Sequence, residues 1–229
     1  MLEQRGIETP RIAAAGEPHL ACVLLLDTSG SMAGNPIRSL NQALNDFKEK
    51  ISLDELAQKR VDVAIISFDD EARIEQDFTP ISEMKSISLS AGGCTSMGAA
   101  INLAIDKVKE RNRFYAELGT PCFKPWIFMI TDGASTDDVS EAAARVRLEE
   151  SKGSHGKLKF FALGVDGYDR EELFKITDRV MELSGTDFTG IFNWLSESMV
   201  AISVSRIGDT VQAQPLPSNV TIPPNDWMN

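Results

Sequence analysis

The chain has 229 residues, of which 42% are hydrophobic and 25% charged, so it can bury the core of one large domain. Asp and Glu outnumber Lys and Arg by 34 to 23, which gives a net charge of -11. A net negative charge is not typical of nucleic-acid-binding proteins, which have basic surfaces, and it does not favour binding to an anionic membrane. We therefore expect neither nucleic acid nor a membrane as a partner.

Three widely spaced cysteines, Cys22, Cys94 and Cys122, form no C-x-x-C pair. Their odd number predicts free thiols in a reducing compartment. The N-terminal residues carry scattered charges and no unbroken apolar run, so they do not resemble a signal peptide. The apolar run that ends before Asp27 is too short to cross a bilayer. Together these features lead us to expect a cytoplasmic protein.

Short apolar runs alternate with helical patterns along the chain. Residues 20–26 are continuously apolar, as in a strand buried on both faces. The expected elements that follow are a helix at 36–51, strands at 61–68 and 73–78, a helix at 98–111, a strand at 126–130, a helix at 139–150, a strand at 158–165, a short helix at 171–177, a short strand at 180–183 and a helix at 188–206. This alternation predicts an α/β fold with a doubly wound, mostly parallel central sheet and helices on both faces.

The two ends of the chain differ from the middle. We expect an N-terminal extension at 1–17, one α/β domain at 18–206 and an extended C-terminal tail at 207–229. The tail holds four prolines, no Lys or Arg and no helical stripe. Its residues 222–227, which include Trp227, are either a docking peptide for another protein or a disordered end.

The string Asp27-Thr28-Ser29-Gly30-Ser31 directly follows the first buried strand. In an open α/β sheet, ligands bind at the carboxyl ends of the strands. Asp27, Ser29 and Ser31 alternate, so a loop that turns over the sheet edge can direct their oxygens at one point, and Gly30 gives that turn its backbone freedom. One carboxylate and two hydroxyls form an oxygen-only ligand set, which favours Mg²⁺, Ca²⁺ or Mn²⁺ over zinc or copper.

Two later residues fit the same point. Thr95 follows a Gly-Gly-Cys string at the start of a helix, and Asp132 follows the strand at 126–130. Each feature has an ordinary structural explanation, because a Ser-rich string can cap a helix and an Asp-Gly pair often forms a turn. In this order and at these strand ends, they predict a divalent-metal site formed by Asp27, Ser29, Ser31, Thr95 and Asp132.

This combination resembles the von Willebrand factor A (vWA) domain and its metal-ion-dependent adhesion site. That family's pattern is Asp-x-Ser-x-Ser, then a Thr in a Gly-rich loop, then an Asp that closes a later strand, and every position is matched over about residues 18–206. The resemblance implies a Rossmann-like three-layer sandwich. It also implies that the hydroxyls contact the metal directly, that the aspartates often act through water, and that an open position accepts an acidic residue of a partner.

Within that family, the strings VLLLDTSGSMAGNPI, GGCTSMGAAINLAID and MITDG most resemble the bacterial tellurium-resistance TerY group. That resemblance implies a stress-response system with kinase-like or phosphatase-like partners. We therefore expect no enzyme but a metal-dependent protein-interaction module of a bacterial tellurite or stress-resistance system. Its partner would supply an Asp or Glu to the cation, for which Mg²⁺ is the first choice and Ca²⁺ or Mn²⁺ the alternatives.

Other functions stay open at this stage. A phosphohydrolase of the haloacid-dehalogenase type would use Asp27 as nucleophile, but Ser29 stands where those enzymes place a second Asp. A scaffold with a purely structural metal is a further alternative. A serine hydrolase lacks its G-x-S-x-G motif, and we expect both histidines, His19 and His155, at the surface. A P-loop is excluded because the Gly-Gly pair before Cys94 is followed by no lysine.

Overall fold

The computed structural model describes residues 11–151, 158–212 and 214–224. In this part of the chain the strands are β1 (Leu20–Asp27), β2 (Val61–Phe68), β3 (Ala72–Pro80), β4 (Trp126–Thr131), β5 (Lys159–Val165), β6 (Val180–Leu183) and β7 (Val220–Thr221). The helices are α1 (Asn35–Ile51), α2 (Glu55–Arg60), α3 (Met97–Glu117), α4 (Ser140–Glu150), α5 (Arg170–Ile176) and α6 (Thr189–Val204), with short 3₁₀ turns η1 (Gly30–Met32) and η2 (Ile81–Glu83).

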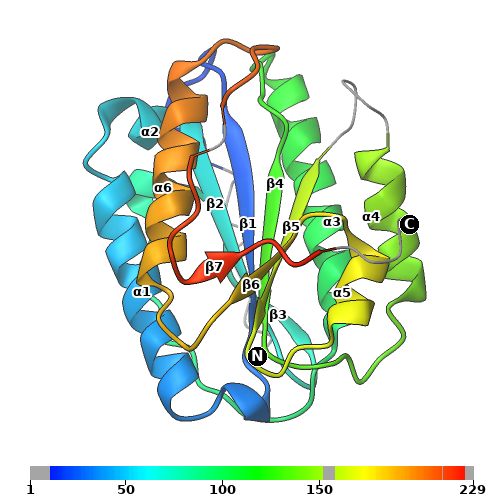
Figure 1. The fold of residues 1–229 in the computed structure, drawn as a ribbon. Coiled ribbons are helices and arrows are strands. Elements are labelled where there is room, and N and C mark those ends of the chain that lie inside the picture. The colour runs from blue at the N-terminus through cyan, green and yellow to red at the C-terminus, as the bar shows by residue number, and fades with distance from the viewer. Residues whose placement is uncertain (1–10, 152–157, 213, 225–229) are drawn as a thin grey trace, which may run out of the picture.

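All described strands join one sheet in the order β3-β2-β1-β4-β5-β6-β7 (Figure 1). The five inner strands β2, β1, β4, β5 and β6 pair in parallel, whereas β3 and β7 are antiparallel edges. Helices α1, α2 and α6 cover one face, and α3, α4 and α5 cover the other. The structure thus confirms the doubly wound, mostly parallel α/β sandwich that the alternation of elements predicts.

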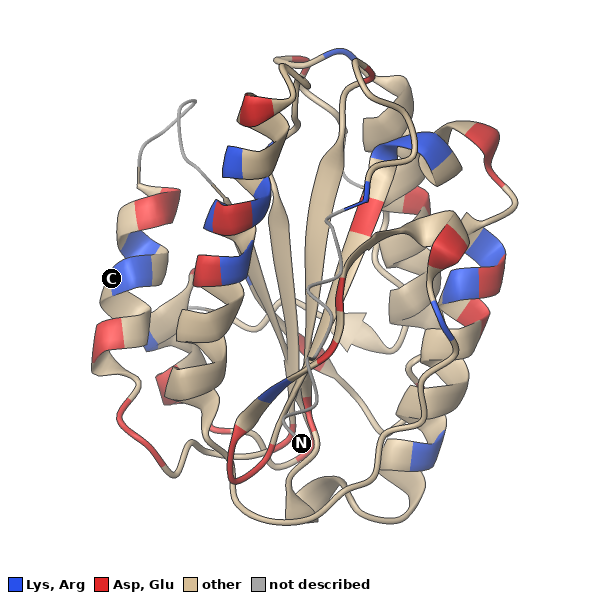
Figure 2. Ribbon diagram, turned by 180° about the vertical axis from the view of Figure 1, so that it is seen from behind, with Lys and Arg blue, Asp and Glu red and all other residues tan. Residues whose placement is uncertain are grey.

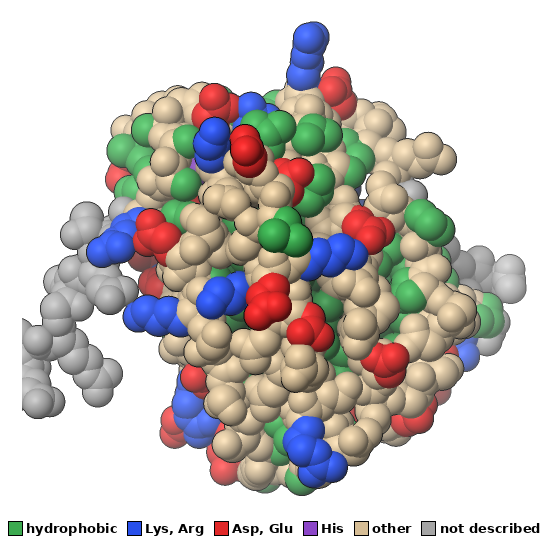
Figure 3. Space-filling model, turned by 90° about the vertical axis from the view of Figure 1, so that its left-hand side faces the viewer, with side chains coloured by type: hydrophobic (Ala, Val, Ile, Leu, Met, Phe, Trp, Pro, Cys, Tyr) green, Lys and Arg blue, Asp and Glu red, His purple; other side chains and the backbone are tan. Residues whose placement is uncertain are grey.

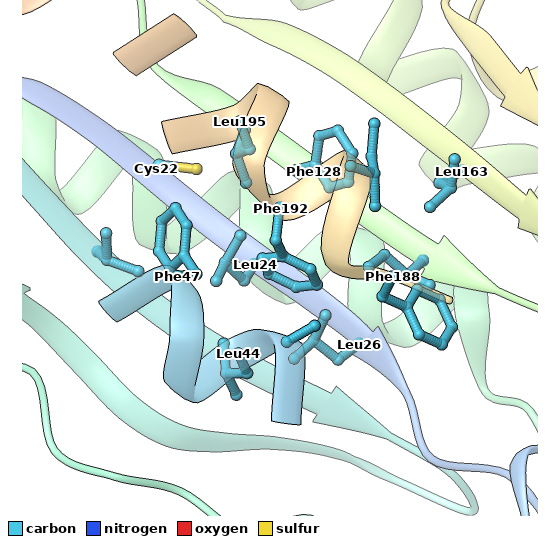
Figure 4. Close-up of a cluster of buried hydrophobic side chains, with 14 of the residues drawn as sticks. Cys22, Leu24, Leu26, Leu44, Phe47, Phe128, Leu163, Phe188, Phe192 and Leu195 are labelled. Atoms are coloured by element: carbon cyan, nitrogen blue, oxygen red, sulfur yellow. The ribbon is translucent and has the colours of Figure 1, made fainter. Parts of the chain in front are cut away.

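Strand β1 lies in the middle of the sheet, and each of its residues is buried. Its even-numbered side chains, such as Leu24, pack with Phe47 of α1 and Phe192 of α6 (Figure 4). Its odd-numbered apolar side chains, such as Val23, pack on the opposite face against α3. Burial on both faces explains why this strand is continuously apolar and not alternating.

The sequence pattern misses one helix and shortens another. The six residues of α2 are too few to show a helical stripe, although Asp54 caps the helix by accepting a hydrogen bond from the Ala57 N–H at 2.7 Å. Helix α3 continues to Glu117, whereas the prediction ends it near residue 111. Tyr115, which is completely buried, lies seven positions after Val108 and continues the buried face of the helix. The charged Arg111 interrupts the apolar stripe at the point where the prediction ends the helix.

The described part of the tail from residue 207 packs on the domain. The indole Nε1 of Trp194 donates a hydrogen bond to the Gln214 carbonyl at 2.9 Å. Val220 and Thr221 form β7 beside β6, and Asn219 Nδ2 donates to the Asp187 carbonyl at 3.0 Å. The tail thus supplies one edge of the sheet. Residues 225–229, including Trp227, lie outside the described residues.

The prediction that His19 lies at the surface is wrong, because its side chain is completely buried. Its Nδ1 lies 2.8 Å from Asp62 Oδ2, and its Nε2 lies 3.0 Å from the Ala14 carbonyl oxygen. Arg111 joins this cluster, with Nη2 3.1 Å from Asp62 Oδ2 and 2.6 Å from the Arg11 carbonyl oxygen. The carboxylate partner of His19 lies 43 positions later in the sequence, so no local pattern reveals this buried contact. The other histidine, His155, lies outside the described residues.

The side of the molecule formed by α1 and α2 carries charged side chains of both signs among scattered hydrophobic ones (Figure 3). Single exposed hydrophobic residues such as Leu53, which is 83% exposed, are common on folded domains. Within the described residues, no helix combines the length and the apolar character needed to cross a membrane.

Candidate metal centre

Two aspartates reach the same edge of the sheet because their strands are parallel neighbours. Asp27 is the last residue of β1, and Asp132 directly follows the end of β4. The two strands pair in register, with Leu26 opposite Ile130. This is the carboxyl edge of the central strands, where ligands bind in open α/β sheets.

The loop after β1 turns over that edge and brings its serines to Asp132. The Ser29 N–H donates to Asp27 Oδ1 at 2.8 Å, which holds the start of the turn. The hydroxyl oxygens of Ser29 and Ser31 lie 3.0 Å apart, and Ser31 Oγ donates to Asp132 Oδ1 at 2.6 Å. These four side chains form one hydrogen-bonded cluster of oxygen atoms.

Thr95 lies beside this cluster. A Cβ atom placed on Gly133 would lie 3.8 Å from Ser31 Oγ and equally far from Thr95 Oγ1, so both hydroxyls border one point. The backbone of Thr95 is fixed from a second loop, because its N–H donates to Thr136 Oγ1 at 3.2 Å and its carbonyl accepts the Thr136 N–H at 2.9 Å. The structure therefore brings Thr95 to the side chains contributed by β1 and β4.

Gly92 and Gly93 pack the loop before α3 against the loop after β1. Gly92 N–H donates to the Thr28 carbonyl at 2.8 Å, and the Gly30 N–H donates to the Gly93 carbonyl at 3.0 Å. Gly93 has a φ of +76°, and a Cβ there would lie 2.7 Å from a carboxylate oxygen of Asp70. A glycine is needed at this position both for its backbone conformation and for the close approach.

Sequence reasoning misses one residue that supports the cluster. Thr131 Oγ1 donates a hydrogen bond of 2.6 Å to Asp27 Oδ2. Both carboxylate oxygens of Asp27 therefore accept hydrogen bonds, since Oδ1 already accepts from Ser29. Thr131 is the last residue of an apolar strand, and its position directly before Asp132 is the available sequence signal.

The two carboxylates are placed where water cannot fully solvate them. Asp27 is 0% exposed and Asp132 is 8% exposed, whereas Ser31 beside them is exposed. Burial raises the pKa of Asp27, although hydrogen bonds from Ser29 and Thr131 oppose this effect, and the nearby charge of Asp132 raises it further. Burial also raises the pKa of Asp132. A divalent cation at this point would favour the ionised form of both groups.

The chemistry of these donors fits a hard divalent cation. The available atoms are hydroxyl and carboxylate oxygens, which suit Mg²⁺, Ca²⁺ or Mn²⁺. Among the described residues, no three His, Cys, Asp or Glu side chains group together as a metal site. The ion would be held by Ser29, Ser31, Thr95 and Asp132. Asp27 would orient Ser29 by accepting the hydrogen bond from its N–H.

Comparison with known families decides the assignment. The profile described as "von Willebrand factor type A domain" matches residues 22–189. The chain belongs to this family. The matched region contains all five residues of the candidate metal centre in this vWA domain.

Solved structures with the same fold come from distant organisms. The pilus adhesin SpaC from Lactobacillus rhamnosus GG, in an open conformation, shares 14% identity at a TM-score of 0.65, over 83% of this chain and 31% of that one. The ArnB paralog VWA2 from Sulfolobus acidocaldarius shares 17% identity at a TM-score of 0.53, over 80% and 46%. Proximal thread matrix protein 1 from the mussel byssus, solved with a zinc-occupied MIDAS motif, shares 19% at a TM-score of 0.51, over 82% and 45%.

Because the sequence identities are low, the likeness to these three structures shows a shared fold and nothing further. The chain spans less than half the length of each of them. No curated protein matches the chain in sequence.

Proposed function

We propose that this vWA domain is a divalent-metal-dependent protein-interaction module. Its partner supplies an Asp or Glu to a cation held by Ser29, Ser31, Thr95 and Asp132, and Mg²⁺ is the favoured ion, with Ca²⁺ and Mn²⁺ as alternatives. The observation that carries the proposal is the continuous cluster of hydroxyl and carboxylate oxygens that ends at the exposed Ser31. A partner side chain can reach the cluster from that side.

The ligand set explains why a carboxylate is the expected partner group. When bound, a divalent cation provides an electrophilic centre that an incoming carboxylate can ligate. The hydroxyls of Ser29, Ser31 and Thr95 are neutral, and Asp27 already accepts two hydrogen bonds from the protein. The site therefore leaves positive charge on the ion, and a carboxylate compensates that charge better than water does.

The environment of Asp27 supports binding over phosphohydrolase chemistry. A nucleophilic carboxylate needs access to its substrate, but Asp27 is 0% exposed and both of its oxygens accept hydrogen bonds. A second acid two residues later is replaced by Ser29. His19 precedes β1 at the amino-terminal end of the parallel strands, opposite the metal centre, and it contacts Asp62 there. It is therefore not placed to act as a base at the metal.

The proposed setting is the cytoplasm of a bacterium with a tellurite or stress-resistance system. It rests on the resemblance of the DTSGS, GGCTSMG and MITDG strings to the TerY group. In that setting the candidate partners are kinase-like or phosphatase-like proteins of the same system. A purely structural metal is the alternative, in which the cation stabilises the three loops and the partner binds elsewhere.

Affinity capture from the native host tests the proposal. The wild-type domain and the Thr95→Ala variant are immobilised and exposed to lysate in Mg²⁺ or in EDTA. We expect a specific partner that is retained by the wild type in Mg²⁺ alone. Neutralising one acidic residue of that partner should have the same effect as EDTA.

Two outcomes contradict the proposal. Equal retention in EDTA and by Thr95→Ala would indicate a structural metal and a binding surface elsewhere. Metal-dependent hydrolysis of a phosphate ester that disappears in Asp27→Asn would favour the phosphohydrolase.

A further inference from the structure

The loops around the metal centre carry charges of one sign. The segments 28–34, 69–71, 90–96, 132–139, 166–169 and 184–188 lie at the carboxyl edge of the parallel strands. They contain no Lys or Arg. Besides the metal-site residue Asp132, they contain eight acidic residues, which we call the acidic rim: Asp69, Asp70, Glu71, Asp137, Asp138, Asp166, Asp169 and Asp187.

A hydrogen bond on one side and a close backbone approach on the other connect this rim to the metal centre. Asp70 Oδ1 accepts the N–H of Cys94 at 2.8 Å, directly before Thr95. On the other side, a Cβ on Gly167 would lie 3.3 Å from the carbonyl oxygen of Asp132, so the loop after β5 lies against the loop after β4. Figure 2 shows red segments in the loops at the lower end of the molecule, where the strands end. A partner that reaches the metal must contact this surface.

Hydrogen bonds to backbone N–H groups just before α4 and α6 explain where two of these carboxylates lie but not why they are charged. Asp138 Oδ1 accepts the Ser140 N–H at 2.9 Å, and Asp187 Oδ1 accepts the Thr189 N–H at 3.0 Å. Serine or asparagine would make equivalent hydrogen bonds without a charge. Hydrogen bonds from the side chain and N–H of Ser140 lower the pKa of Asp138, and those from the N–H and side chain of Thr189 lower the pKa of Asp187, so both are ionised at neutral pH.

Three arginines of neighbouring elements stand against the eight carboxylates of the rim: Arg38 in the first turn of α1, Arg73 of β3 and Arg170 at the start of α5. Arg73 of β3 pairs with Asp69, with Nη1 2.6 Å from Oδ2. Six other rim residues are exposed, namely Asp70, Glu71, Asp138, Asp166, Asp169 and Asp187. A carboxylate that approaches the metal on an acidic or neutral surface is repelled by these groups, whereas a basic surface is attracted.

We propose that the partner presents its metal-ligating Asp or Glu within a basic surface, with Lys or Arg side chains on both sides that contact the acidic rim. This inference rests on the proposed function, since it describes the surroundings of the same ligating carboxylate. The cation would select the carboxylate, and the rim would select the charge of the flanking residues. The attraction would also accelerate encounter, and salt would weaken it.

Four fluorescein-labelled peptides of equal length test the inference by anisotropy titration in Mg²⁺. Their central sequences are Lys-Lys-Asp-Lys-Lys, Ser-Ser-Asp-Ser-Ser, Glu-Glu-Asp-Glu-Glu and Lys-Lys-Asn-Lys-Lys. At about 50 mM salt we expect the Lys-flanked Asp peptide to bind about tenfold or more tightly than the Ser-flanked one, and the Glu-flanked one to bind most weakly. At about 300 mM salt the difference should shrink. The Asn peptide should bind at least about tenfold more weakly than its Asp counterpart.

Rim variants locate the effect on this chain. The triple variant Glu71→Gln, Asp138→Asn, Asp166→Asn keeps all five metal-site residues and should retain its Mg²⁺ affinity in calorimetry while losing the preference for Lys flanks. A matched control, Asp77→Asn, Glu117→Gln, Asp209→Asn, removes equal charge from exposed residues outside the rim and should keep that preference.

The outcomes separate this inference from the proposed function. Mg²⁺-dependent binding that is equal for Lys-flanked and Ser-flanked Asp peptides would overturn the basic surface and leave the metal-dependent module standing. A loss of preference in the control variant to the same extent would likewise exclude the rim. Binding that survives EDTA, or the absence of binding by every Asp peptide, would overturn the proposed function and this inference together.

Discussion

The hydroxyl of Ser31 donates a hydrogen bond of 2.6 Å to the carboxylate of Asp132, across 101 positions of sequence. This contact joins the loop after β1 to the loop after β4. Because Ser31 is exposed and Asp132 is buried, the bond connects the surface of the site to its interior. A change in either loop should therefore alter the metal centre as a whole.

Divalent cations should stabilise the folded domain. With free Mg²⁺, Ca²⁺ or Mn²⁺ at a hundred times its dissociation constant, mass action raises the free energy of unfolding by about 2.7 kcal/mol. The Asp132→Ala variant should fold but lose this gain, because the residue lies at the sheet edge and not in the hydrophobic core. Thermal unfolding with and without EDTA measures the effect. Asp209→Ala, at an exposed position far from the site, is the control and should respond like the wild type. A cation response that persists in Asp132→Ala would place the ion elsewhere.

Helix α3 packs closely on the loop 132–139 after β4, so Gly98→Ala should lower both stability and metal affinity. The added Cβ would lie 2.6 Å from the Asp138 carbonyl oxygen and 3.1 Å from Asp137 Oδ2. Because the nearest atom belongs to the backbone, the loop must move, at a cost of about 1–3 kcal/mol in unfolding free energy. Metal affinity should fall as well, since Asp132 lies on the same loop.

The matched control for that experiment is Gly92→Ala. A Cβ at Gly92 would meet no atom within 4 Å, so this variant should keep both its stability and its metal affinity. Urea denaturation and calorimetry compare the two variants. Equal behaviour of the pair would show that close packing at Gly98 does not position the loop 132–139.

The buried carboxylate of Asp62 should be essential for stability. It lies 2.8 Å from His19 Nδ1 and 3.1 Å from Arg111 Nη2, and it accepts a hydrogen bond from the Tyr115 hydroxyl. Asp62→Ala leaves a buried guanidinium without its carboxylate, and we expect a loss of about 3–5 kcal/mol in urea denaturation. Asp106→Ala breaks an exposed pair with Arg145 and should cost less than about 1 kcal/mol. Similar losses in both variants would argue against a stabilising role for the buried cluster.

Truncation after Gly208 tests the tail. The shortened chain loses β7, the buried Val220 and the carbonyl of Gln214 that accepts the Trp194 N–H. We expect the free energy of unfolding to fall by roughly 1–3 kcal/mol, because an indole N–H loses its partner and apolar surface becomes exposed. The sequence pattern alone predicts little change from this truncation. A chain that ends at Pro224 keeps these contacts and should match the full-length stability in thermal and urea unfolding.

The sequence by itself determined the fold class and the candidate ligands. The continuous apolar run of β1 indicates burial on both faces, and the alternation with helices indicates parallel strands. The spacing of Asp27, Ser29 and Ser31 after that run indicates one ligand loop. Such signals are local, since period and spacing are readable within a few residues.

Contacts between distant segments were decided by the tertiary structure alone. Thr131 donates a hydrogen bond to Asp27, 104 positions earlier in the sequence. The buried His19 contacts the carboxylate of Asp62, 43 positions later. The tail becomes a sheet edge because β6 leaves backbone groups to pair. The acidic rim likewise exists because parallel strands bring acidic loops from four parts of the chain to one end of the sheet. A one-dimensional pattern records the charges, but their accumulation at one site depends on how the strands are ordered.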